Sequence, residues 1–404
     1  MRQGFAKTGL LSMLLAGITA TQPAFAQNAQ WVPLWTAAPQ PLWDNAKAIF
    51  GTGLPDRIAG TTIEQPLTLA MSAQHVRIEF SNRYGDRPLE IAEGSVRCLD
   101  AGTDQVLSRL TFDNAIRASA PAGGRVISDP LAVAGCRRLA VSIRFFSANG
   151  GDFHWDARET SRYETADGAQ GTMTARLALS AVYGDVRVKG VVVALGDSIT
   201  DGNGAPIDAM VRWPDDLARN LAPHDIAVVN GGISGNRLLR DGMGKALIER
   251  LATDAFALPR VDTVVLLIGT NDIAWPGTPF AADEPAMTLD AMKAGFRSAI
   301  AQADLQGVRM IVATIAPFNG ALPGTPMHDT YWTPEKDRLR RAFNDWLRSE
   351  HGSAELFDLD RLVADPANPL RLLPAYDSGD RLHPGAIGNR AIADALTTII
   401  QSGE

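Results

Sequence analysis

The chain has 404 residues, of which 46% are hydrophobic and 21% are charged, with 38 Lys and Arg against 45 Asp and Glu. This length and apolar content suffice for two domains with hydrophobic cores of their own. The formal net charge of −7 argues against nucleic acid or an anionic membrane surface as the main partner.

Residues 1–26 have the composition of a secretory signal peptide. Arg2 and Lys7 precede an apolar stretch over residues 9–20, and Ala24 and Ala26 directly precede the expected cleavage site. This stretch is shorter than the ~20 residues that a membrane-spanning helix needs. No later segment is long and apolar enough to span a bilayer. We therefore expect cleavage after Ala26, no integral membrane contact, and a periplasmic or secreted protein.

Residues 27–188 alternate between apolar and polar side chains, which predicts an antiparallel β-sandwich. The alternation is clearest in His75–Ser81, Arg138–Phe145 and Thr174–Val182. Turn-forming residues separate these runs, and several short strands with such turns are typical of a sandwich. No flexible linker precedes residue 189, so we expect this domain to pack against the following one.

The chain has two cysteines, Cys98 and Cys136, both within the expected β-domain. In an oxidising compartment two such cysteines are expected to form a disulfide. Two separate buried thiols are the alternative. Without a nearby histidine pattern, the pair does not make a metal site.

From residue 189 to residue 404, apolar strands alternate with helical patterns. The expected strands lie at 191–195, 226–229, 264–268, 310–315 and 356–359, and the expected helices at 213–221, 289–305, 334–350 and 384–400. This alternation is typical of an α/β domain in which helices cover both faces of a parallel sheet.

Ser198 directly follows the first of these strands. The apolar run Val191–Leu195 breaks at Gly196, and Asp197 and Ser198 begin the next turn. Open α/β sheets bind their ligands at the carboxyl ends of strands, and this position suits a nucleophile. A serine that only caps the following helix is the alternative interpretation.

Three further blocks follow in order: Asn230–Leu239 (NGGISGNRLL), Val264–Asp272 (VVLLIGTND) and Asp380–Pro384 (DRLHP). Together with Val191–Thr200 (VVVALGDSIT), they resemble the four blocks of the SGNH/GDSL hydrolase superfamily, over about residues 191–400. One residue departs from the first block, Ile199, where the family usually has leucine. The resemblance implies a three-layer, flavodoxin-like α/β domain that hydrolyses esters.

A serine hydroxyl needs an adjacent base to act as a nucleophile, and His383 is the best candidate among six histidines. Asp380 lies three residues earlier, where its carboxylate could accept from the imidazole ring and fix its tautomer. The resemblance assigns the same roles, with Ser198 as nucleophile, His383 as base and Asp380 as the orienting carboxylate. A histidine at the start of a surface helix is the alternative.

Acyl transfer also needs hydrogen-bond donors that stabilise a tetrahedral oxyanion. The chain offers the backbone N–H groups of Ser198 and Gly235 and the side-chain amide of Asn271, and the resemblance gives the matching glycine and asparagine this role. Gly232 is the rival of Gly235, and the spacing to Asn236 favours Gly235. Ordinary turn residues are the alternative.

Asp197 and Asp272 flank these candidates, and we interpret both as residues that organise turns by accepting backbone hydrogen bonds. The glycine-rich segments match neither a dinucleotide-binding nor a phosphate-loop pattern. The remaining histidines lack the spacing of metal ligands. We therefore predict no metal and no organic cofactor.

Six aromatic residues near the blocks are candidates for the substrate pocket, with packing in the core or anchoring of loops as the alternative for most of them: Trp275, Phe280, Phe318, Tyr331, Trp332 and Tyr376. In the N-terminal domain, Trp35 and the segment Phe153–Asp156 either bind sugar or lie in the core.

The sequence thus predicts a serine esterase that acts through an acyl-enzyme on a small-molecule or glycan ester. A β-domain ahead of such a hydrolase domain resembles some bacterial carbohydrate esterases, so deacetylation of a carbohydrate or small ester is the first expectation. A lipase or lysophospholipase-like esterase, an O-acyltransferase and a non-enzymatic glycan-binding protein are the alternatives. The sequence leaves the oligomeric state open.

Overall fold

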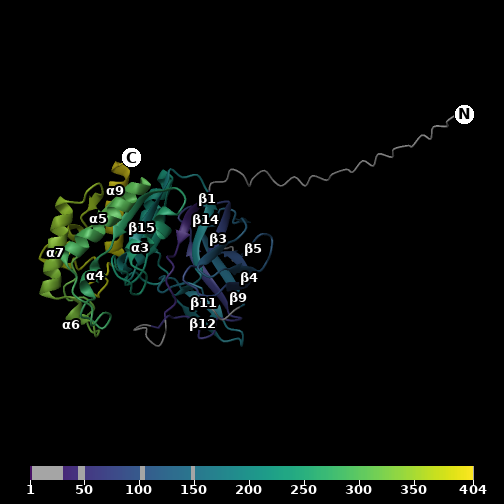
Figure 1. Ribbon diagram of the computed structural model, residues 1–404, viewed down its shortest axis with the longest axis horizontal. Helices are drawn as coiled ribbons and strands as arrows, with labels where there is room; N and C mark the ends of the chain where they lie inside the picture. The colour runs from purple at the N-terminus through teal and green to yellow at the C-terminus, as the bar shows by residue number, and fades with distance from the viewer. Residues whose placement is uncertain (2–30, 44–50, 101–104, 147–150, 404) are drawn as a thin grey trace.

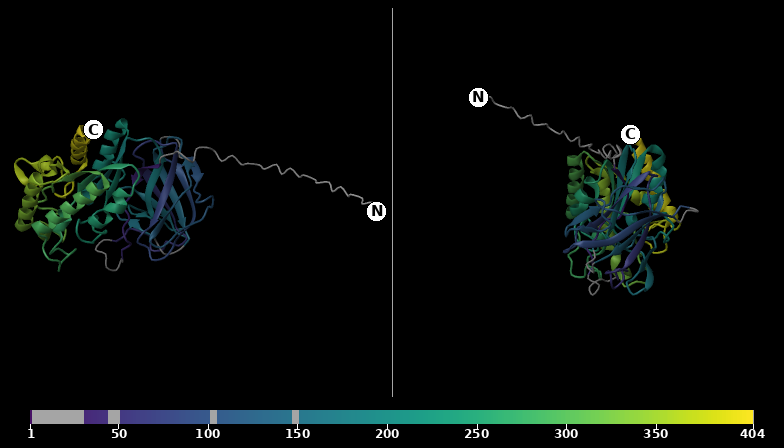
Figure 2. Two further views of the ribbon diagram at one scale, coloured as in Figure 1. Left: turned by 45° about the horizontal axis from the view of Figure 1, so that its top comes forward. Right: turned by 90° about the vertical axis from the view of Figure 1, so that its right-hand side faces the viewer.

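The computed structural model describes Met1 and residues 31–43, 51–100, 105–146 and 151–403. Two parts lie side by side, an all-β part and a part in which helices cover a sheet (Figures 1 and 2). The predicted signal peptide falls almost wholly outside the described residues, so cleavage after Ala26 stays a prediction.

Two antiparallel sheets build the N-terminal part (Figure 1). The first has β1 (Trp31–Thr36), β14 (Leu179–Asp185), β3 (His75–Asn82) and β7 (Gly124–Ile127) in this order, with β8 (Leu131–Ala132) beside β3. The second runs β12 (Gln170–Met173), β11 (Ser161–Glu164), β2 (Thr62–Thr68), β9 (Arg138–Phe145), β4 (Leu89–Cys98) and β5 (Gln105–Arg109), with β6 (Ala118–Ala120) beside β4.

The predicted alternation explains how these sheets bury one face each. Val76, Ile78 and Phe80 of β3 are fully buried, and so are Leu139 and Val141 of β9. All belong to one apolar cluster, because alternate side chains of a strand point to the same face. The predictions of a strand over His75–Ser81 and of one over Arg138–Phe145 are confirmed.

The predicted strand Thr174–Val182 is interrupted at Ala178. This residue has a φ of 60°, which turns the chain because a left-handed residue does not continue a strand. The short β13 (Arg176–Leu177) before it pairs with β10 (Phe153–His154), and β14 after it joins the sheet of β1 and β3. The prediction of one continuous strand over this segment was therefore wrong, although apolar residues do recur at every second position in it.

A disulfide joins Cys98 at the end of β4 to Cys136 just before β9, as predicted. The bond closes a loop of 38 residues. In the loop-entropy account, closure on this scale stabilises the fold by roughly 4 kcal/mol.

Five parallel strands form the sheet of the C-terminal part. Their order is β16 (Ile226–Gly232), β15 (Gly190–Gly196), β17 (Val261–Leu267), β18 (Arg309–Ala313) and β19 (Glu355–Phe357). Numbered along the chain, this is the order 2-1-3-4-5 of flavodoxin-like folds. The predicted fold class is confirmed, and β15 lies where the strand order reverses, the position at which such sheets bind ligands.

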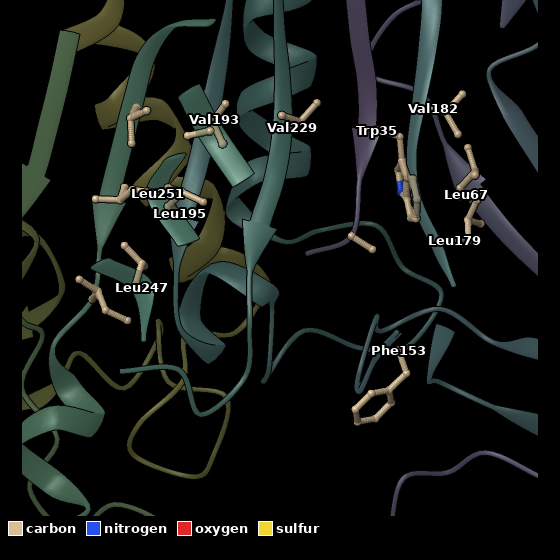
Figure 3. Packing of buried hydrophobic residues seen from close by; sticks show 14 of the residues in the cluster. Trp35, Leu67, Phe153, Leu179, Val182, Val193, Leu195, Val229, Leu247 and Leu251 are labelled. Carbon is tan, nitrogen blue, oxygen red and sulfur yellow. The ribbon is translucent and has the colours of Figure 1, made fainter. Parts of the chain in front are cut away.

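Helices cover both faces of this sheet, because β15 is apolar on both sides. Val192 and Ala194 belong to one cluster with α2 (Trp213–Leu221) and α9 (Ala386–Ser402). Val193 and Leu195 belong to the other, together with α3 (Leu247–Leu251), α5 (Leu289–Gln306) and α7 (Pro334–Ser349). Figure 3 shows Val193 and Leu195 beside Leu247 and Leu251.

The remaining elements are short. They are α1 (Ser198–Asp201), η2 (Ala222–His224), η3 (Ala252–Phe256), α4 (Thr270–Ala274), α6 (His328–Tyr331), α8 (Leu359–Val363), β20 (Ala364–Asp365) and β21 (Asn368–Leu372). The predicted strand at 356–359 ends earlier, at Phe357, because Asp358 caps α8 by accepting from the Arg361 N–H. The predicted helix at 384–400 begins later, at Ala386.

The two parts are joined directly, since β14 ends at Asp185 and β15 begins at Gly190. The predicted boundary at residues 188 and 189 falls between them. Across the interface, Thr36 Oγ1 of β1 donates to the Asn230 carbonyl of β16 at 2.7 Å. Among the helices of the described residues, none has the length and apolarity needed to cross a membrane.

Candidate active site

Ser198 is the first residue of α1, immediately past the end of β15. Asp197 caps this turn, and its Oδ1 accepts from the Ile199 N–H at 3.0 Å. Gly196 makes the tight turn possible, because a Cβ there would overlap Thr200 Oγ1 and the Leu267 carbonyl. The strand end therefore delivers the Ser198 hydroxyl to the carboxyl edge of the sheet.

The structure brings Ser198, His383 and Asp380 into one hydrogen-bonded chain. His383 Nε2 lies 2.8 Å from Ser198 Oγ, and His383 Nδ1 lies 2.6 Å from Asp380 Oδ2. Because the carboxylate accepts from Nδ1–H, Nε2 is left as the acceptor for the serine proton. Ser198 and His383 are 185 residues apart in sequence.

Asp380 is held ionised by its surroundings. Burial by itself would raise its pKa, but the hydrogen bond and charge of His383 and the N–H groups of Leu382 and His383 hold the pKa well below its usual range. Those two N–H groups lie 2.9 and 2.8 Å from Asp380 Oδ1. Backbone N–H groups of its own loop therefore fix the carboxylate, in addition to its hydrogen bond with the imidazole ring.

Gly235 and Asn271 line the same cavity as Ser198 and His383. Gly235 has a φ of 72°, and a Cβ at this position would overlap Met243 Sδ, so glycine suits the turn on both counts. The rival Gly232 uses its N–H on Asn230 Oδ1 at 2.9 Å and is not among the lining residues. The geometry therefore favours Gly235 over Gly232 as a donor to a ligand.

Two partners fix the side-chain amide of Asn271. Its Nδ2 donates to the Asn236 carbonyl at 3.0 Å, which leaves the second N–H for a ligand. Its Oδ1 accepts from the Tyr331 hydroxyl at 2.7 Å. Burial raises the pKa of Tyr331, so the phenol stays protonated and donates. The sequence indicated Tyr331 as a candidate for the pocket but not its bond to Asn271, because the two residues are 60 positions apart.

Asp197 and Asp272 accept backbone hydrogen bonds, as predicted. Asp272 is fully buried, and it accepts from the Leu238 and Leu239 N–H groups at 2.7 and 3.1 Å. It thereby anchors the segment that follows Gly235 to the turn that carries Asn271. Burial raises the pKa of Asp272 and raises that of Asp197 to about 7.

A cavity of about 520 Å³ opens beside Ser198. Apolar side chains from five regions of the chain line most of it: Trp155, Met243, Trp275, Pro279, Phe280, Leu322, Pro326, Met327, Tyr331 and Leu382. The rings of Trp275 and Phe280 stack with their centroids 4.6 Å apart. No Lys, Arg, Asp or Glu is among the described residues that line the cavity.

Of the six aromatic residues predicted for the pocket, Trp275, Phe280 and Tyr331 line it, and Trp332 packs against the apolar core. Phe318 is fully buried behind Tyr331, with the two rings 5.9 Å apart, so it supports the wall from outside. Tyr376 packs against the cluster on the opposite face of the sheet, together with α9. For Phe318 and Tyr376, the alternative interpretation of core packing is therefore correct.

The N-terminal domain contributes Trp155 to the cavity wall. Its neighbour Phe153 lies in the core, and Trp35 is buried beneath the guanidinium of Arg176, 4.9 Å from the ring centroid. The Met243 carbonyl accepts from Gln40 Nε2 at 2.6 Å and from Trp43 Nε1 at 2.9 Å. The β-domain therefore holds one side of the cavity. From the sequence, the aromatic residues of this domain could equally have bound sugar or packed in the core.

Comparison with known proteins places this site in a family. Residues 194–391 match the model of the GDSL-like lipase/acylhydrolase family. A comparison with curated protein sequences found no match. Among solved structures, a GDSL-like lipase from Bacteroides thetaiotaomicron is 18% identical with a TM-score of 0.40, covering 53% of this chain and 89% of its own.

Two other solved structures are similar over the same half of the chain. The aryl esterase of M. smegmatis is 18% identical with a TM-score of 0.40, covering 53% of this chain and 99% of its own. An acetylxylan esterase from Geobacillus stearothermophilus is 24% identical with a TM-score of 0.38, covering 53% and 94%. The family match and the four blocks at the strand ends agree: residues 194–391 belong to the GDSL-like lipase/acylhydrolase family, and the protein is a carboxylic ester hydrolase.

Proposed function

We propose that the protein is a serine esterase that hydrolyses uncharged, hydrophobic carboxylic esters through an acyl-enzyme on Ser198. One observation carries the proposal: the hydrogen-bonded chain Ser198–His383–Asp380 opens into a cavity of about 520 Å³ that is mostly apolar. The chain supplies a nucleophile with its base, and the cavity supplies a place for the substrate.

In the first half of the reaction, Ser198 Oγ attacks the ester carbonyl carbon and its proton passes to His383 Nε2. The tetrahedral intermediate then collapses and its C–O bond to the alcohol breaks. His383 Nε2 gives the proton to the departing alkoxide, and an acyl ester remains on Ser198. Asp380 stays ionised throughout and stabilises the imidazolium.

In the second half, a water molecule gives a proton to His383 Nε2 and attacks the acyl carbon. Collapse of the second intermediate releases the carboxylic acid and returns the proton to Ser198 Oγ. In both halves, the N–H groups of Ser198 and Gly235 and the free amide N–H of Asn271 act as donors to the oxyanion. Such donors act mainly in the transition state, so they raise kcat more than they lower KM.

The lining favours the longer-chain alternative over a small acetyl ester. A cavity of this volume is in the range that buries ligands of drug size, far beyond what an acetyl group fills. A charged headgroup placed inside would lose its hydration without gaining a partner. A fatty acyl or an aryl group is therefore the better occupant. Deacetylation of a carbohydrate remains a prediction made from the sequence alone.

We also propose that the protein acts in the periplasm or outside the cell. Residues 1–26 have the features of a secretory signal. The Cys98–Cys136 disulfide supports an oxidising compartment, where such bonds persist.

The test is hydrolysis of p-nitrophenyl acetate, butyrate and octanoate by the protein without residues 1–26, beside its Ser198→Ala variant. We expect kcat/KM to rise with chain length and Ser198→Ala to lose on the order of 10⁴-fold or more. Activity that persists in Ser198→Ala would refute the serine mechanism. A preference for acetate over octanoate would refute the hydrophobic substrate and restore the small-ester expectation.

A further inference from the structure

We infer that His154 of the N-terminal domain is a positioning residue that holds the Gly235 segment of the active site in place. His154 lies in β10 and is 5% exposed, and its Nε2 lies 3.0 Å from Asp201 Oδ1. Asp201 ends α1, three residues after Ser198. The role rests on the proposed function, because Gly235 matters there as an oxyanion donor.

Both ring nitrogens of His154 face acceptors. Nδ1 lies 3.0 Å from the Ala38 carbonyl, which can only accept, so Nδ1 carries a proton. The other ring nitrogen, Nε2, faces Asp201 Oδ1 at 3.0 Å. The ring therefore ties the Ala38 carbonyl of the β-domain to the Asp201 carboxylate of α1.

Asp201 passes this constraint to the neighbour of Gly235. Its second oxygen, Oδ2, accepts from the Ser234 N–H at 2.8 Å and from Ser234 Oγ at 2.7 Å. Asn203 Oδ1 lies 2.8 Å from the same hydroxyl. Since Ser234 directly precedes Gly235, the path His154–Asp201–Ser234 sets the orientation of the peptide that carries the Gly235 N–H.

Stability alone does not account for this pair. Asp201 is 2% exposed, and burying a carboxylate beside an imidazole costs desolvation that an apolar pair of the same shape would avoid. What the polar pair supplies is direction, because hydrogen bonds fix the angle of the Ser234 peptide and apolar packing does not. The same segment of the β-domain also places Trp155 in the cavity wall.

The first measurement is hydrogen exchange of the whole protein, followed by mass spectrometry of the segment 231–239. His154→Phe keeps a ring of similar size without donors, and His154→Gln keeps one N–H for Asp201. Thr36→Val is the matched control, since it removes another hydrogen bond between the two domains. We expect exchange of the segment to rise about tenfold or more in His154→Phe and to stay within about threefold in the other two.

The second measurement is turnover of p-nitrophenyl butyrate. In His154→Phe we expect kcat to fall about 10–100-fold, the range for a misplaced catalytic group. KM should change less than about threefold, because the donor acts mainly in the transition state. His154→Gln should recover most of kcat.

Two outcomes would overturn the role of His154. Unchanged exchange of the segment in His154→Phe would do so, and so would equal losses in His154→Phe and His154→Gln, which would indicate packing alone. If His154→Phe does not fold, Ser234→Ala removes the hydroxyl bond at the other end of the same path and should loosen the same segment, although the Ser234 N–H keeps its bond to Asp201. The exchange measurement needs no turnover, so failure of the proposed function appears separately, as activity retained by Ser198→Ala or absent from the wild type.

Discussion

The Tyr331 hydroxyl donates to Asn271 Oδ1 at 2.7 Å and so decides which way the Asn271 amide points. Rotating an asparagine amide by half a turn exchanges its oxygen and nitrogen, so the amide turns either an acceptor or a donor toward a ligand. Only the donor stabilises an oxyanion. Tyr331, the last residue of α6, thereby controls the chemistry of Asn271 in α4, the turn that follows β17.

Tyr331→Phe should therefore lower kcat by about tenfold with little change in KM, because the amide loses one of the two hydrogen bonds that orient it and keeps only the bond to Asn236. Steady-state kinetics on p-nitrophenyl butyrate would measure this. Tyr376→Phe is the matched control, since Tyr376 packs on the other face of the sheet. Equal kinetics in the two variants would remove Tyr331 from this role.

Asp380→Asn should lower kcat by about 10⁴-fold, because an amide in place of the carboxylate favours the wrong tautomer of His383. Stability gives a second readout. Because the folded-state pKa of Asp380 is lowered, its carboxylate contributes fully to the free energy of unfolding at any pH above the unfolded-state pKa, ~3.9. This contribution is lost as the pH falls through the folded-state pKa.

Urea unfolding of the wild type and Asp380→Asn between pH 3 and pH 7 would measure this contribution. The difference in unfolding free energy should be constant above about pH 5 and shrink below about pH 4. A difference that grows toward acid would contradict the ionised carboxylate.

Asp197→Asn should stabilise the protein at pH 8 and have little effect at pH 4. Burial raises the folded-state pKa of Asp197 to about 7, above its unfolded value, so the folded state binds the extra proton between these values. Stability is therefore lost as the pH rises from about 4 to about 7. The neutral amide avoids this loss while its Oδ1 still accepts from the Ile199 N–H.

Thermal unfolding of both proteins at pH 4, 6 and 8 would measure this effect, with a gain of about 1–3 kcal/mol expected at pH 8. The measurement at pH 4 serves as the control, because the wild type and Asp197→Asn should have nearly equal stability there. A destabilised Asp197→Asn at pH 8 would show that the ionised carboxylate is needed for the turn.

Phe280→Ala should reduce the preference for long acyl chains. The change removes a ring that lines the cavity and stacks on Trp275, so kcat/KM for octanoate should fall about 10–100-fold while that for acetate changes little. Phe146→Ala is the control, because Phe146 is 67% exposed and lies outside the cavity. Equal losses on acetate and octanoate would indicate that Phe280 supports the fold rather than the acyl chain.

Local patterns predicted most of the fold. The helix Trp213–Leu221 was predicted with both its ends, because Pro214 and the apolar spacing are signals within the segment itself. The apolar run before Ser198 predicted β15 for the same reason. The strand over Thr174–Val182 was wrong, because the left-handed turn at Ala178 serves the pairing with β10, which is remote in sequence.

The sequence by itself also predicted Ser198, Asp380 and His383 as a candidate triad, since each stands in a block with a recognisable order and spacing, and the structure joins them by hydrogen bonds. Only the tertiary structure decided which aromatic rings face the cavity, which glycine offers its N–H, and that Tyr331 and His154 reach the site. These contacts join residues 60 and 47 positions apart or come from another domain. Hydrogen bonds and packing of this kind depend on where whole sheets and loops come to lie, and no local period or motif encodes that placement.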